Sequence, residues 1–78
     1  MNIKELLVKR DGEDEAKSEI LMVCENIGYD MESMPFDQAI LRALDDLNLE
    51  KDYAEDVANL FYEWEADKAI EAYPRLKT

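Results

Sequence analysis

The chain has 78 residues, enough for one domain and close to the lower size limit for a core that is stable by itself. Hydrophobic residues make up 47% of it, which argues against disorder, and two glycines and two prolines are too few for the turns of a small β-sandwich. Twenty acidic residues against nine basic ones give a net charge of −11, which repels nucleic acid and anionic membranes and attracts basic surfaces. We therefore expect a single acidic, all-α domain over residues 1–78.

The acidic charge is concentrated in the middle of the chain. Residues 18–67 carry fourteen acids and only two bases, Arg42 and Lys51, whereas residues 68–78 carry one acid and three bases. This charge has two interpretations, which the sequence leaves open. It attracts a basic partner, or it serves only to keep a small protein in solution.

The sequence also bears on where the protein is located. Charged residues occur from Lys4 onward, and no apolar run approaches the 18 residues of a membrane span, so we expect neither a signal peptide nor a membrane anchor. The single cysteine, Cys24, cannot form an intramolecular disulfide. We therefore expect a cytoplasmic protein.

The first predicted helix is short and begins after Asn2, which can cap it, with Glu5 in the position of a capping box. Its buried side would hold Ile3, Leu6 and Leu7, and Gly12 would supply the turn that ends it.

The second predicted helix extends from about Glu13 to Ile27. Acidic residues crowd its start, where the helix dipole favours negative charge. Apolar residues then recur at core spacing at Ala16, Ile20, Val23, Cys24 and Ile27. Gly28 is expected to end this helix as a left-handed C-terminal cap.

The third predicted helix follows a connection over residues 29–34. Ser33 and Pro35 indicate its start, with Ser33 as the capping residue. Its core-facing residues are Phe36, Ala39, Ile40, Ala43, Leu44 and Leu47. Asn48 is expected to end it in the left-handed conformation, and residues 49–51 form a tight link.

The last predicted helix is the longest, from Asp52 as its cap to Tyr73, where Pro74 ends it. It carries two apolar stripes on roughly opposite sides. The first contains Tyr53, Val57, Leu60, Phe61 and Trp64, and the second contains Tyr62, Ala66, Ala69, Ile70 and Tyr73. The fold expected is a bundle of three main helices plus a short N-terminal helix. Its predicted core is Leu6, Leu7, Ile20, Val23, Cys24, Ile27, Phe36, Ile40, Leu44, Leu47, Val57, Leu60, Phe61 and Trp64.

The second stripe also has two interpretations. It packs against the short N-terminal helix, or it is a surface for a dimer or another partner, for which its tyrosines are well suited.

The residue types present exclude most catalytic sites. The chain has no histidine, so Ser-His, Cys-His and Cys/His zinc sites are impossible, and its two glycines form no phosphate-binding loop. No stretch has the ligand spacing of an EF-hand. Cys24 is interpreted as a buried, inert thiol. We therefore expect no enzyme activity, no bound metal and no cofactor.

One stretch resembles a known family. Glu32-Ser33-Met34, followed by Ala43-Leu44-Asp45-Asp46-Leu47, is similar to the region of acyl carrier proteins where a serine in an Asp-Ser-Leu motif carries phosphopantetheine. The resemblance covers residues 30–60 and would make Ser33 the modified residue. Glu32 and Met34 stand where the motif has aspartate and leucine, and Pro35 follows Met34. The loop before the serine is shorter than in the family.

Acidic or amide side chains recur about once per turn on one side of the last helix. They are Asp52, Asp56, Asn59, Glu63 and Asp67, with Glu55 beside them. Acids four residues apart repel each other, and only Lys51 and Lys68, near its two ends, are placed to relieve this. One helix does not reach the phosphate density of DNA. The acids of neighbouring helices, among them Asp45 and Asp46, would add to this row if they lie on the same side.

The function expected from these features is binding without catalysis. The chain would occupy a basic, nucleic-acid-binding surface of a partner protein and inhibit it, with no direct binding to nucleic acid or membrane. Its acids would steer association, and Tyr62, Ile70 and Tyr73 would supply desolvated contacts. Phage-encoded inhibitors, anti-CRISPR proteins and DNA mimics are of this type, although no motif is shared. The alternatives are a structural or regulatory homodimer formed through the second stripe, and a carrier protein modified at Ser33.

Overall fold

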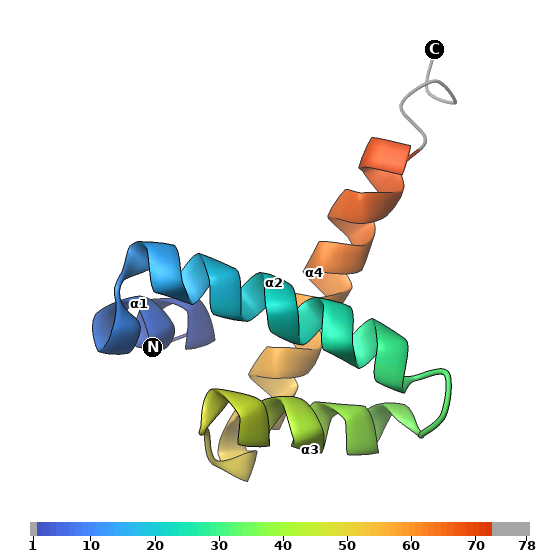
Figure 1. The fold of residues 1–78 in the computed structure, drawn as a ribbon, viewed down its shortest axis with the longest axis horizontal. Coiled ribbons are helices and arrows are strands. Elements are labelled where there is room, and N and C mark those ends of the chain that lie inside the picture. The colour runs from blue at the N-terminus through green and yellow to red at the C-terminus, as the bar shows by residue number, and fades with distance from the viewer. Residues whose placement is uncertain (1, 73–78) are drawn as a thin grey trace.

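A computed structural model describes residues 2–72 of the chain. Over this range the protein consists of four α-helices and one short 3-10 helix, without a strand (Figure 1). The elements are α1 (Ile3–Asp11), α2 (Glu13–Asp30), α3 (Phe36–Leu47), η1 (Lys51–Tyr53) and α4 (Ala54–Ala72). The prediction of an all-α bundle with a short first helix is confirmed. Tyr73 and Pro74, expected as a partner contact and as the end of the last helix, lie outside the described residues.

Helices α1 and α2 form a hairpin around Gly12. The side-chain oxygen of Asn2 accepts a hydrogen bond of 2.9 Å from the backbone N–H of Glu5, which confirms Asn2 as the cap of α1. Gly12 has a φ of +93°, a conformation that side chains rarely adopt, and its N–H donates to the carbonyl of Val8. A single residue, Gly12, therefore separates the end of α1 from the start of α2.

The prediction that Gly28 caps α2 is wrong. The helix continues through Gly28 to Asp30, and the only glycine with positive φ among the described residues is Gly12. Gly28 lies against α4 instead, since a Cβ atom placed on it would be 3.8 Å from Cε1 of Phe61. A methyl group would also fit at this contact, so the position does not require glycine, and α2 extends beyond the end that local signals indicate.

Two further helix starts differ from expectation. Ser33 does not cap α3, because Pro35 occupies the capping position and the hydroxyl of Ser33 donates 3.4 Å back to the carbonyl of Asp30. Asp52 does not cap the last helix, because it lies inside η1, and α4 begins two residues later. The end of α3 was predicted correctly, with Asn48 left-handed at φ 57° and ψ 46°.

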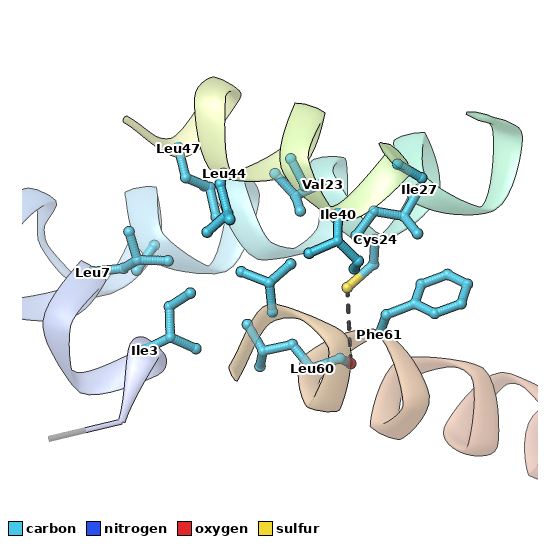
Figure 2. Packing of buried hydrophobic residues seen from close by; sticks show 14 residues of the cluster. Ile3, Leu7, Val23, Cys24, Ile27, Ile40, Leu44, Leu47, Leu60 and Phe61 are labelled. Carbon is cyan, nitrogen blue, oxygen red and sulfur yellow. Dashed lines mark hydrogen bonds between the residues drawn. The ribbon is translucent and has the colours of Figure 1, made fainter. Parts of the chain in front are cut away.

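The core lies where α2, α3 and the first half of α4 meet, and α1 closes one end of it (Figure 2). Most of the predicted core residues are buried, whereas Leu6, Ile20, Phe36 and Trp64 are only partly buried. Ile3, Ala16, Ala39 and Ala43 are buried in addition. The thiol of Cys24 lies 3.9 Å from the carbonyl oxygen of Leu60, so α2 and α4 also meet through a weak hydrogen bond.

Arg10 joins three helices outside this core. Its guanidinium donates to the carbonyl of Leu47 at the C-terminal end of α3, at 2.8 Å, and pairs with the carboxylates of Asp11 at 2.8 Å and Glu19 at 3.3 Å. A positive charge at this position also complements the negative end of the α3 dipole. Arg10 therefore fixes the α1–α2 hairpin against α3.

Helix α4 belongs only partly to the bundle. Its first half packs on α3 and α2, and its second half extends past α2 on the side away from α3 (Figure 1). The described residues measure 42 × 30 × 18 Å with a radius of gyration of 13.3 Å, against about 11 Å for a compact chain of this length. Residues 65–70 are all exposed. Among the described residues, the projecting half of α4 is therefore a second long, fully exposed segment besides residues 8–15.

The two glycines provide a test of the α2 assignment. Gly28→Ala should raise the free energy of unfolding by about 0.5–1 kcal/mol, because alanine is the better helix former and its methyl group fits against Phe61. Gly12→Ala should lower it by about 1–3 kcal/mol, because the φ of 93° and ψ of 161° at this residue lie in a region that side chains rarely adopt. Urea unfolding of both variants measures these changes. A destabilised Gly28→Ala protein would contradict a helical Gly28.

Candidate partner-binding surface

Among the described residues, three grooves border α4, each formed with a different helix. The α1–α4 groove, the α3–α4 groove and the α2–α4 groove have volumes of about 230, 310 and 460 Å³. Because successive residues of a helix are about 100° apart, the parts of α4 that line them point in different directions. Of the acids expected on the last helix, Asp56 and Glu63 line the α1–α4 groove, and Glu55 lines the α3–α4 groove.

The α1–α4 groove holds three residues of the predicted row of acidic and amide side chains, Asp56, Asn59 and Glu63. It is lined by Asn2, Ile3, Lys4, Asp56, Asn59, Leu60 and Glu63. Lys4 Nζ lies 3.3 Å from the carboxylate of Glu63, and both side chains are more than half exposed. The expectation that only Lys51 and Lys68 could relieve repulsion in this row is wrong, because folding brings Lys4 to it from the other end of the chain. An exposed pair of this kind contributes little stability, about 0–1 kcal/mol.

The α3–α4 groove is apolar with acidic edges. Phe36, Ile40, Leu41, Ala54 and Ala58 form its apolar lining, and Asp37 and Glu55 complete it. Tyr62 lies at its end on α4, where its ring stacks on Phe36 with centroids 5.5 Å apart. Leu41 and Tyr62 are 43% and 58% exposed. Two exposed large apolar side chains, Leu41 and Tyr62, therefore lie at this groove beside the partly buried ring of Phe36.

The α2–α4 groove combines aromatic and charged side chains. It is lined by Glu25, Gly28, Tyr29, Glu32, Phe61, Trp64, Glu65 and Lys68. The ammonium of Lys68 lies 4.5 Å from the centre of the Trp64 ring, within cation–π distance. This groove was not predicted from the sequence, because α2 was expected to end before Tyr29. The spacing of Glu25, Tyr29 and Glu32 along one helical face would have indicated it if α2 had been continued through Gly28.

The second apolar stripe does not pack against α1. Tyr62 and Ile70 are 58% and 53% exposed, and Ala66 and Ala69 are exposed between them. The buried residues of α1, Ile3 and Leu7, join the main core instead, and α1 meets α4 beside Asp56 and Leu60, which belong to its other side. The first of the two interpretations of this stripe is therefore wrong for its described part.

The remaining predicted contact residues are spread over the surface. Asp45 and Asp46 are exposed on α3, Asp52 is exposed on η1, and Asp67 is exposed on the projecting half of α4. None of these four lines one of the three grooves. Asp45 does lie one helical turn from Leu41, and Asp37 lies one turn from Leu41 in the other direction. The two carboxylates therefore flank the exposed leucine of the α3–α4 groove.

The residues considered for covalent chemistry are not combined into a reactive site. Burial raises the pKa of the Cys24 thiol to about 11, as expected for an inert core cysteine. Ser33 is exposed, and its hydroxyl donates to a backbone carbonyl. In residues 2–72, no group of three or more acidic or cysteine side chains is placed to hold a metal ion. Over the same range, every helix is too short or too polar to cross a bilayer.

The largest changes in carboxyl pKa occur away from the grooves, around Arg10. A hydrogen bond from Arg10 lowers the pKa of Asp11 below its usual 3.8. Burial raises the pKa of Glu19 above its usual 4.5, and the neighbouring Asp11 carboxylate raises it further. One oxygen of Glu19, Oε1, is buried without a hydrogen-bond partner among the described residues. This cluster joins α1, α2 and the end of α3.

Comparison with known proteins identifies no relative, since the chain matches no protein-family model, no curated protein and no solved structure.

The Arg10 cluster predicts opposite effects for two neutralising substitutions. At neutral pH, Asp11→Asn should destabilise the fold and Glu19→Gln should stabilise it, because the fold favours ionised Asp11 and protonated Glu19. The Glu19→Gln difference should shrink as the pH falls through the raised pKa of Glu19 towards 4.5, and the Asp11→Asn difference should shrink only as the pH falls below 3.8 towards the lowered pKa of Asp11. Thermal unfolding across this pH range measures the effect. Destabilisation by both substitutions at neutral pH would contradict the assignment for Glu19.

Proposed function

We propose that this chain is a non-enzymatic binding protein that occupies a basic surface of another protein and blocks it. The observation that carries the proposal is the projecting half of α4, which exposes an apolar stripe and carboxylates together. Exposed apolar surface of this kind marks interaction sites. The net charge of −11 favours a partner of opposite charge and speeds the encounter with it.

We propose further that the blocked surface is one that binds nucleic acid. Repeated carboxylates, such as Glu63 and Asp67 on successive turns of α4, offer negative charge at intervals of about 6 Å. Phosphates along one strand of DNA recur about every 3.4 Å, so acids of several elements would have to contribute. As part of this proposal the protein acts in the cytoplasm, where its single cysteine stays a free thiol.

Two variants with equal net charge test the proposal. The first neutralises four acids of α3 and α4 (Asp37→Asn, Asp45→Asn, Glu55→Gln and Asp67→Asn). The second neutralises four exposed acids elsewhere (Glu5→Gln, Asp14→Asn, Glu15→Gln and Glu50→Gln). Each set removes four negative charges from −11, so both variants carry −7.

Proteins captured from a cell lysate by wild type and by each variant are identified by mass spectrometry. We expect a basic partner that is released by raised salt and by duplex DNA, captured by wild type and by the second variant, and weakened about tenfold or more with the first. Equal capture by both variants would show that the acids of α3 and α4 serve solubility alone. A partner that duplex DNA does not release would refute the nucleic-acid-binding surface.

A further inference from the structure

The α3–α4 groove lies between α3 and the start of α4, and Tyr62 lies at its end. Ala54, Ala58 and Tyr62 follow one another at intervals of four residues. Because residues four apart on a helix are rotated by about 40°, Ala66 and Ile70 lie progressively further round α4 and do not continue this line. At 1.5 Å per residue, the line from Ala54 to Tyr62 extends about 12 Å, which two to three turns of a partner helix would cover.

The depth and lining of the groove fit the side chains of a helix. Its volume of about 310 Å³ exceeds that of one large apolar side chain, and its walls come from both α3 and α4. In helix-in-groove recognition, apolar residues spaced by three and four positions enter such a hollow between two helices. Leu41, which is 43% exposed at its edge, would be covered by this contact.

The charges at the edges decide which helix fits. Asp37 and Glu55 belong to the lining, and Asp45 lies one turn from Leu41, while no basic residue is part of the lining. In a dimer formed through this surface, two chains of charge −11 would bring these carboxylates together, and like charges in contact destabilise an interface. The same edges attract lysine and arginine.

We propose that the α3–α4 groove, with Tyr62 at its end, binds the apolar face of a cationic amphipathic helix of a partner protein. This inference rests on the proposed function and makes it specific. The basic surface of the partner would be one side of a helix, and its apolar residues would contact Leu41, Ala58 and Tyr62. The carboxylates of Asp37, Asp45 and Glu55 would face the lysine and arginine residues that flank the partner's apolar face.

The test uses the full chain, labelled with ¹⁵N, and three synthetic helical peptides of about five turns. The first peptide carries leucines at helical spacing and lysines elsewhere. The second keeps the leucines and has glutamates in place of the lysines. The third keeps the lysines and has glutamines in place of the leucines. Chemical shifts report where each peptide binds, and titration gives its affinity.

A pair of protein variants completes the design. Leu41→Gln removes an apolar edge of the groove, and Leu21→Gln makes the same change at a leucine of α2 that is 50% exposed and outside the groove. Both positions face solvent, so both variants should fold, and their unfolding transitions check this. We expect the first peptide to shift the signals of Leu41, Ala54, Glu55 and Ala58. Leu41→Gln should weaken this binding about tenfold, and Leu21→Gln should leave it unchanged.

The other outcomes overturn the inference in distinguishable ways. If the lysine peptide without leucines binds equally well, the groove is not the site, while attraction to a basic partner stands. If the glutamate peptide binds equally well, the edges do not select charge, and the proposed function loses its electrostatic basis. Absence of shifts in the groove with every peptide overturns the inference directly. If sedimentation shows a wild-type dimer that Leu41→Gln dissociates, the occupant is a second copy of this chain.

Discussion

Burial of one side of the first half of α4 is the interaction on which the rest of the structure depends. Val57, Leu60 and Phe61 are buried against α2 and α3, and each fully buried side chain of this size stabilises the fold by about 1.5–3 kcal/mol. Gly28 lies beside the ring of Phe61, and the thiol of Cys24 meets the carbonyl of Leu60. Because α2 and α3 also pack on each other, the first half of α4 completes a core that all three helices share.

Because this burial involves only the first half of α4, the helix has two different environments along its length. The helix forms one groove with each of α1, α2 and α3, and the α2–α4 groove extends along its second half to Trp64, Glu65 and Lys68. Its second half is held in place by the first and exposes all of residues 65–70. A small core can extend a helix in this way, since propagation of a formed helix is easier than its nucleation. The bundle therefore acts as a base for a projecting surface.

The charges follow the same division. Glu63 is paired with Lys4 in the α1–α4 groove, Asp11 and Glu19 are held by Arg10, and the edges of the α3–α4 groove have no basic residue in their lining. Acids that look equivalent in the sequence thus have different roles. Some neutralise basic residues of the fold itself, and others remain available to a partner. The net charge of −11 is the sum of these roles and does not describe any single face.

The sequence by itself determined the helices, most of the core and the local turns. The spacing of apolar residues, the cap at Asn2, the turn at Gly12 and the left-handed Asn48 depend on residues close together in the chain, so they could be predicted. Only the tertiary structure decided that α2 continues through Gly28, that Lys4 meets Glu63 across 59 positions, and that the second stripe stays exposed. These outcomes depend on which helix packs on which. The spacing of apolar residues shows which side of each helix is buried. Which other helix covers that side depends on how all the helices pack together.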